Sequence, residues 1–422
     1  MKTVISVLCM MITVATLSAG QGIIGTPGTE LSPAQSIATI RQTISEKPTE
    51  YAAYNLLAMA LIRRAQETTD VSFYRQAEDA IEKSLAMAPN NFETEKIRIS
   101  ILLGEHEYPA ALEAAMALNK RVPDDVMVYG LLTDANVELG NYEDAEDSAQ
   151  WMLNLRRGNR PAFIRAAHLR ELFGDAEGAY EMMDLAYQST SPGDPEERAN
   201  ILTQMGHFRL ASGNIDAAEN LFQQALTSLP NCPAALGDVA QVRITQKRYA
   251  EAVVLLQQRY QGVPRAENLY DLAEALKLAG RDGEAKRAFA DFESKSLLEA
   301  NKKDNSNREL AFYYADHAQQ PAKALKVAQR EYAWRHDVYT LDAYAWALHV
   351  NGQDAEARKQ IETALAVGIR DPRLFLHAGE IALKAGNVPA AERYLKRSAE
   401  VNTPDSEQAR SLLASLSMRS KR

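Results

Sequence analysis

One short pattern recurs along the chain: a glycine followed five residues later by an alanine. It occurs at Gly140, Gly174, Gly213, Gly280, Gly352 and Gly386, which lie 34, 39, 67, 72 and 34 residues apart. The two long intervals are close to twice the short one, and each contains an equivalent position, Lys247 or Gln319, with an alanine five residues later. A fixed period in this range is typical of repeat architectures. The sequence from about 51 to 405 therefore predicts ten copies of one unit.

Each copy has the pattern of a helical hairpin. In the unit from residue 199, apolar and small residues recur at helical spacing through Leu202, and a second apolar stripe follows through Phe222. Gly213 lies between them, where a left-handed backbone conformation reverses the chain. Ala218 is small enough to let the second helix lie close to the first, and Pro230 ends that helix. The unit therefore predicts two antiparallel helices.

These units resemble the tetratricopeptide repeat, or TPR. The resemblance rests on Leu202, Gly206, Gly213, Ala218, Phe222, Ala225 and Pro230, and on Leu272, Gly280, Ala285 and Phe289. It implies an all-α fold: a right-handed superhelical solenoid of about ten TPR-like hairpins, in which the first helix of each hairpin lines the concave face. Single hairpins cannot bury their own apolar face, so stacked neighbours form the core, and a C-terminal helix is expected to cap the stack.

The repeats predict the organisation of the chain. The expected segments are a signal peptide (1–20), a leader with an N-terminal helix (21–50), units 1–4 (51–190), units 5–7 (199–298), units 8–10 (305–405), and a capping helix with a tail (406–422). In the capping helix, Leu412, Leu413 and Leu416 share one face. Polar stretches near 190–198 and 299–307 lengthen the repeat, and each is either a longer surface loop or a hinge.

The N-terminus has the pattern of a secretory signal. Lys2 is followed by the apolar run TVISVLCMMITVATL and then by small residues, so we expect cleavage after Ala19 or Gly20. The alternative is an uncleaved anchor, although the run is shorter than the ~20 residues of a spanning helix. No later segment is apolar enough to cross a bilayer. The expected location is the bacterial periplasm, with a secreted or membrane-anchored protein as the alternative.

Charge and motifs argue against several classes of function. The formal net charge of −9 and the lack of a basic stripe give no support to nucleic-acid binding. The chain has no phosphate-binding loop, no G-x-S-x-G and no H-E-x-x-H, and its seven histidines are scattered. After the signal, Cys232 is the single cysteine, so an internal disulfide is not expected. We expect no catalytic site, no metal and no cofactor.

The expected binding face follows from the first helices of the hairpins. Steps of one repeat from His207 lead to a column of mostly polar residues, and helical spacing adds their neighbours. The candidate groove residues are Tyr313, Trp346, His349, Tyr339, Asp342, Asp316, His168, His207, Gln241 and Glu274. Two interpretations remain open for the large aromatics, Tyr313 and Trp346: they pack between hairpins, or they contact a partner.

Two functions follow from this face. The first is a non-catalytic scaffold or adaptor that binds other proteins or peptides in assembly or maintenance of the cell envelope. An aromatic patch with acidic neighbours suits a peptide that carries apolar and basic side chains. The alternative is a solenoid that binds a glycan or small ligand through His168, His207, Asp134 and Glu274. The partner and the oligomeric state stay open, because one scaffold serves many functions.

Overall fold

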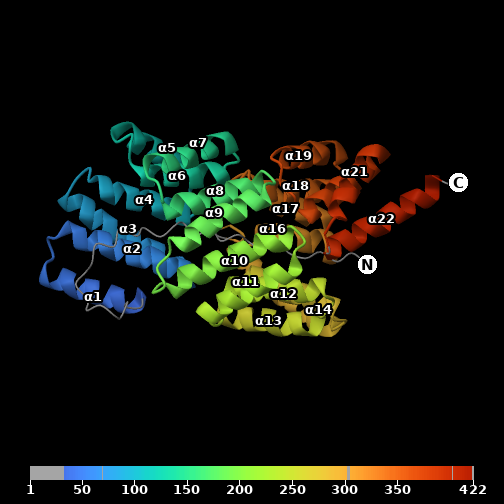
Figure 1. The fold of residues 1–422 in the computed structure, drawn as a ribbon, viewed down its shortest axis with the longest axis horizontal. Coiled ribbons are helices and arrows are strands. Elements are labelled where there is room, and N and C mark those ends of the chain that lie inside the picture. The colour runs from blue at the N-terminus through green and yellow to red at the C-terminus, as the bar shows by residue number, and fades with distance from the viewer. Residues whose placement is uncertain (1–32, 69, 302–304, 402, 421–422) are drawn as a thin grey trace. The chain divides into compact units, whose positions relative to one another are not determined.

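The computed structural model describes residues 33–68, 70–301, 305–401 and 403–420. The predicted signal peptide and most of the predicted leader lie outside these residues. Within the described ranges the regular structure is entirely helical, with α-helices α1 to α22 and one π-helical turn, η1 (Figure 1). None of the helices described is long and apolar enough to span a membrane.

The helices pair in chain order. After α1 (Pro33–Glu46), the hairpins of the first part are α2–α3 (Tyr51–Thr68, Ser72–Met87), α4–α5 (Phe92–Gly104, Tyr108–Arg121), α6–α7 (Val126–Glu138, Tyr142–Leu155), α8–α9 (Arg160–Leu172, Ala176–Gln188) and α10–α11 (Pro195–Ala211, Ile215–Ser228). The hairpins of the second part are α12–α13 (Pro233–Thr245, Tyr249–Gly262), α14–α15 (Ala266–Leu278, Asp282–Glu299), α16–α17 (Asn307–Phe312 with η1 at Tyr313–His317, then Pro321–Tyr332), α18–α19 (Val338–Val350, Asp354–Ala366) and α20–α21 (Pro372–Lys384, Val388–Ser398). With α22 (Pro404–Ser420) at the end, the predicted all-α solenoid of ten hairpins is confirmed.

The turns inside the hairpins have the predicted backbone conformation. Gly213 has a φ of 77°, and its asparagine neighbour then caps α11 by accepting a hydrogen bond from the Ala217 amide. Lys247 and Gln319, which replace glycine in two units, also have positive φ angles of 60° and 54°. The repeated alanines lie at the contact between the helices, and Ala218, for example, is 0% exposed. The glycine of the repeated pattern therefore acts through local backbone geometry, and the alanine acts through close packing of the two helices.

The chain forms two compact units, residues 33–165 and 166–420 of the described part, and their boundary lies inside α8. It does not coincide with either predicted hinge region. In the first unit, α1 to α4 share one buried cluster that includes Leu61 and Ile81, and α4 to α6 share a second that includes Leu131. Each cluster joins consecutive hairpins, as expected for a solenoid.

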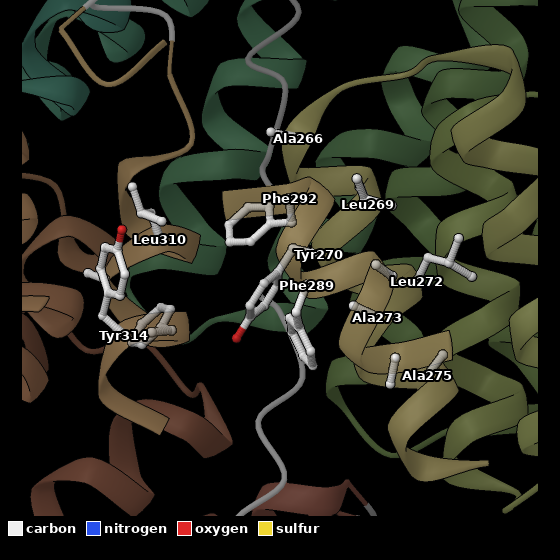
Figure 2. Packing of buried hydrophobic residues seen from close by; sticks show 14 of the residues in the cluster. Ala266, Leu269, Tyr270, Leu272, Ala273, Ala275, Phe289, Phe292, Leu310 and Tyr314 are labelled. Carbon is white, nitrogen blue, oxygen red and sulfur yellow. The ribbon is translucent and has the colours of Figure 1, made fainter. Parts of the chain in front are cut away.

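The second unit has a core that runs from α12 to α18. Figure 2 shows Tyr270 of α14 beside Phe289 and Phe292 of α15, with Tyr314 from the next hairpin. The ring centroid of Tyr270 lies 5.9 Å from that of Phe289 and 5.0 Å from that of Phe292. These contacts fill the space within the α14–α15 hairpin, and the contacts of Phe289 and Phe292 with Tyr313 continue the aromatic cluster into the next hairpin.

The last helix packs as a cap. Leu412, Leu413 and Leu416 of α22 pack against a buried cluster that contains Leu376 of α20 and Leu395 of α21. The predicted apolar face of α22 therefore covers the end of the last hairpin.

Candidate binding face

The inner face of residues 166–420 is formed by the first helices of the hairpins, α8, α10, α12, α14, α16 with η1, α18 and α20. It does not form the open polar surface expected from sequence. Glu274, Asp342, Trp346 and Asp316 are only 1–6% exposed. Tyr313, Tyr339, His349, His168, His207 and Gln241 are half-buried. The expectation of an exposed face is thus wrong for four of the candidate residues, because polar side chains from neighbouring first helices contact one another.

Trp346 belongs to a buried network that joins three hairpins. Its indole Nε1 donates a hydrogen bond to Asp316 Oδ1 over 3.0 Å, and its ring stacks on His377 with centroids 4.1 Å apart. Nδ1 of His377 lies 2.7 Å from Asp342 Oδ1. Burial by itself lowers the pKa of His377, but the Asp342 carboxylate outweighs burial, so this pKa is raised. Of the two interpretations of Trp346, packing between hairpins is the one observed.

The π-helical turn η1 presents polar side chains to both neighbouring helices. The Tyr314 hydroxyl donates a hydrogen bond to Glu293 of α15 over 2.8 Å, and Tyr313 contacts the same carboxylate at 3.4 Å. His317 pairs with Glu274 of α14, and Nδ1 of His317 lies 2.9 Å from the Lys277 ammonium. A π-helical turn carries an extra residue per turn and is frequent at functional sites. The repeat pattern of the sequence did not predict it.

His207 lies in a second polar cluster, between α8, α10 and α12. Its Nε2 lies 3.2 Å from Glu171, and His168 approaches the same carboxylate at 3.7 Å. Burial raises the pKa of Glu171, but hydrogen bonds with both histidines outweigh it and lower this pKa to about 2. Burial lowers the pKa of His207, but Glu171 outweighs it and raises this pKa to about 9. His207 and Glu171 are therefore both charged at neutral pH.

The carboxylate of Asp238 completes this cluster. It lies 4.0 Å from Nδ1 of His207, and its Oδ2 is buried without a hydrogen-bond partner. Burial raises the pKa of Asp238 to about 6, although His207 and Arg259 act in the opposite direction. The inner face thus holds a buried carboxylate whose negative charge is only partly balanced by nearby positive groups.

The ligand contacts expected for the alternative function are largely occupied. In the first unit, Asp134 accepts two hydrogen bonds from Arg165, at 2.8 and 2.5 Å, and both side chains are buried. In the second unit, Glu274 is paired with His317. His168 and His207 remain half-buried. The structure does not bring Asp134 together with the other three residues within one unit.

Sequence reasoning missed most of a second column of charged residues, of which it named only Asp342; this column lies one helical turn before the predicted column. It contains Asp238, Asp271, Glu309, Asp342 and His377. It also missed Arg373 on α20, whose side chain is fully buried. The repeat spacing could have predicted this second column, since its residues lie three or four positions before Gln241, Glu274, Tyr313, Trp346 and Glu380. Nothing in the register distinguishes Arg373.

The described residues offer neither a metal centre nor an accessible thiol. Within the described ranges, no group of three or more histidine, cysteine, aspartate or glutamate residues could hold a metal ion. Cys232 is buried, and burial raises the pKa of its thiol, so this thiol is unreactive. The groups on this face that could contact a partner are its aromatic rings and its buried charged side chains, some of which are better paired than others.

The tetratricopeptide repeat family matches this chain at residues 209–259 and 344–407. Among curated proteins, cellulose synthase operon protein C of Xanthomonas axonopodis pv. citri (strain 306) is 32% identical over 124 residues. That match covers 29% of this chain and 8% of the relative, so the chain corresponds to a small part of that protein.

Solved structures with a similar arrangement of helices share little sequence. The human IFIT1 dimer with PPP-AAAA is 13% identical, with a TM-score of 0.48, over 87% of this chain and 95% of that chain. PilW, described as a widely conserved type IV pilus biogenesis factor, is 16% identical, with a TM-score of 0.43, over 55% and 98%. Yeast Tom70 is 13% identical, with a TM-score of 0.37, over 86% and 96%. These likenesses concern the fold alone. The ten helical hairpins form a TPR-like solenoid, and two segments of it match the tetratricopeptide repeat family.

Proposed function

We propose that this protein is an exported, non-catalytic scaffold that binds proteins or peptides through the inner face of its hairpins, in assembly or maintenance of the cell envelope. The observation that carries the proposal is the inner face itself. It combines segments that match the tetratricopeptide repeat family with aromatic and acidic side chains, and the described residues include no group of three or more histidine, cysteine, aspartate or glutamate residues that could hold a metal ion. Repeat proteins of this kind are usually non-catalytic scaffolds.

Two further observations support the envelope part of the proposal. Residues 1–20 have the composition of a secretory signal, which would direct the mature protein out of the cytoplasm. The curated relative is named for a cellulose synthase operon, although it shares only a short segment with this chain. N-terminal sequencing of the protein purified from a periplasmic extract tests this part. A new N-terminus near residue 20 or 21 supports export, and an intact Met1 in the cytoplasmic fraction contradicts it.

Crosslinking capture from the native envelope tests the binding function. We would compare the mature protein with a Tyr313→Ala, His349→Ala variant, since both side chains are half-buried on the inner face. Trp346 is unsuitable for this purpose, because its removal would disturb the core. Trp151→Ala is the matched control: Trp151 is a large aromatic that is 51% exposed on α7, a second helix.

The proposal expects specific proteins captured by the wild type and by the control, and lost by the inner-face variant while its helical circular-dichroism signal is unchanged. Loss only in the control would place binding on the second helices instead. If none of the three forms enriches a protein, the scaffold proposal fails. The alternative of a glycan or small ligand near His168 and His207 would then be tested by ligand screens.

A further inference from the structure

Three buried side chains of residues 166–420, each from a different hairpin, have polar atoms without a hydrogen-bond partner among the described residues. These atoms are all three side-chain nitrogens of Arg373 on α20, the hydroxyl of Tyr270 on α14, and Oδ2 of Asp316 in η1. The three residues are 2%, 0% and 6% exposed. Buried polar atoms are nearly always paired in folded proteins, so such a set indicates a place for a ligand or for bound water.

Arg373 and Asp316 belong to one network of contacts. The guanidinium of Arg373 lies 4.9 Å from the centre of the Phe312 ring, and the Phe312 ring lies 5.8 Å from that of His377. The His377 ring stacks on Trp346 at 4.1 Å. The Trp346 indole donates to Oδ1 of Asp316, which leaves Oδ2 of that carboxylate to bind something else. A single network therefore joins the unpaired donor and the unpaired acceptor.

Tyr270 lies near both of these groups, on a helix three hairpins before α20. Burial raises the pKa of Tyr270, Asp316 acts in the same direction, and Arg373 acts in the opposite one. Figure 2 shows the Tyr270 hydroxyl directed away from the ring of Phe292. With its pKa raised, the hydroxyl stays protonated, and it can both donate and accept a hydrogen bond.

The charges around Arg373 disfavour an added ion. Burial lowers the pKa of Arg373, but nearby carboxylates, those of Asp405, Asp371 and Asp342, outweigh burial and raise it. The positive charge of Arg373 is thus already balanced. An added anion would be repelled by these carboxylates and would give Asp316 no donor. A second cation would be repelled by Arg373 and would give its nitrogens no acceptor. An uncharged group suits the site best.

The unpaired atoms require both an acceptor and a donor from that group. A guanidinium only donates hydrogen bonds, whereas a carboxylate oxygen only accepts them. A carboxamide supplies both needs, since its oxygen can accept two hydrogen bonds and its nitrogen can donate two. Its bonds to Arg373 and Asp316 would be charge-assisted and therefore stronger than bonds between neutral groups. Among amino-acid side chains, asparagine and glutamine carry this group, and glutamine has the longer reach.

Solvent reaches the inner face close to these buried groups. Asp371 comes two residues before Arg373 and is half-buried. It lies within electrostatic reach of His207 on α10, whose side chain is 27% exposed. The accessible part of the inner face therefore borders the buried polar groups.

We propose that Arg373, Tyr270 and Asp316 form an enclosed subsite of the inner face that takes the carboxamide of a glutamine side chain from a bound peptide. Arg373 and Tyr270 donate to the carboxamide oxygen, and Oδ2 of Asp316 accepts from the carboxamide nitrogen. This inference rests on the proposed peptide-binding function and assigns to it the side chain that the face recognises.

The first test compares two tyrosines in the protein without a partner. Tyr270→Phe removes a hydroxyl that has no hydrogen-bond partner, so the midpoint of urea unfolding should stay unchanged or rise. Tyr314→Phe is the matched control, because Tyr314 is also buried, at 2% exposure, but its hydroxyl donates to Glu293 over 2.8 Å. This change should lower the midpoint. An equal decrease in both variants shows that the Tyr270 hydroxyl is already paired, and it overturns the subsite.

The second test uses three pools of twelve-residue peptides that have random flanks and a central glutamine, glutamate or leucine. In fluorescence polarisation, the glutamine pool should bind the mature protein about tenfold more tightly than the other two. Tyr270→Phe should remove most of this preference, as should Arg373→Met if that variant folds. Tyr314→Phe should keep it.

The other outcomes of the second test are equally decisive. Equal binding of the three pools shows that the buried groups bind water only, and a preference for glutamate shows that the site takes an anion; either result overturns the subsite. The unfolding comparison requires no partner, and capture from the envelope tests the inner face as a whole. Successful capture together with equal binding of the pools therefore refutes the subsite alone, whereas failure of capture refutes the proposed function.

Discussion

Gly206 on α10 offers a sharp test of how the hairpins pack. A Cβ atom at this position would lie 2.6 Å from Cδ1 of the Phe222 ring on α11, which is far inside normal contact. Phe222 is 0% exposed and belongs to a cluster with Ala218, Val239 and Val242. The ring therefore has no free space into which it could move. We expect Gly206→Ala to destabilise the second unit.

The expected size follows from two opposing terms. Overpacking in a filled core costs about 1–3 kcal/mol, and a contact this short with a fully enclosed ring belongs at the upper end. Replacing glycine by alanine inside a helix raises the free energy of unfolding by about 1 kcal/mol. The net loss in the free energy of unfolding should be about 2 kcal/mol. Gly283→Ala on α15 is the control, because a Cβ there meets nothing within 4 Å. It should be neutral or stabilise by up to about 1 kcal/mol.

Urea unfolding followed by circular dichroism measures both variants. Phe222→Leu removes the ring that meets the new Cβ, so Gly206→Ala and Phe222→Leu together should cost less than the sum of the two single changes. The coupling free energy should be about 1–2 kcal/mol. Equal stability of Gly206→Ala and Gly283→Ala, or additive effects in the double variant, would refute this account of the contact.

Three further predictions concern the inner face. Because the pKa of His207 is raised to about 9 and that of Glu171 is lowered to about 2, their pair stabilises the protein fully between about pH 4.5 and 6.5. Its contribution, at most about 3 kcal/mol, is lost as pH rises from 6.5 through 9, and His207→Gln should flatten that slope in thermal unfolding measured across this range. Because the pKa of Asp238 is raised to about 6, ionisation of this carboxyl lowers the free energy of unfolding, and the loss grows as pH rises from 3.8 through about 6. Asp238→Asn should therefore raise the free energy of unfolding by about 1–3 kcal/mol at pH 7 and leave it unchanged below pH 3.8. A gain at both pH values would contradict this. Trp346→Phe leaves the Asp316 carboxylate without its indole donor and should lower the free energy of urea unfolding by about 2–4 kcal/mol. Trp151→Phe, at a half-exposed position, should lower it by less than about 0.5 kcal/mol. Similar losses in the two variants would contradict burial of Trp346.

The sequence by itself determined the hairpins. Their turns depend on residues that are adjacent in the chain, and positive φ angles occur at Gly213 and also at Lys247 and Gln319, as the repeat spacing predicts. Alanines such as Ala218 mark the buried contact between two helices that are joined by a short turn. Each of these features is local, so periodicity within about 34 residues is sufficient to predict it.

The tertiary structure decided what the inner face contains. Small rotations between hairpins accumulate along a solenoid, so the chain meets itself at residues that no repeat spacing connects. Gly174 contacts Gly368, 194 residues later, and Arg373 lies among side chains of α14, α16 and α18. The sequence identified Trp346 as a groove residue but could not show that its indole is buried against His377. Whether a polar column faces solvent or its own neighbours depends on the curvature of the stack, and the curvature is a property of all the hairpins together.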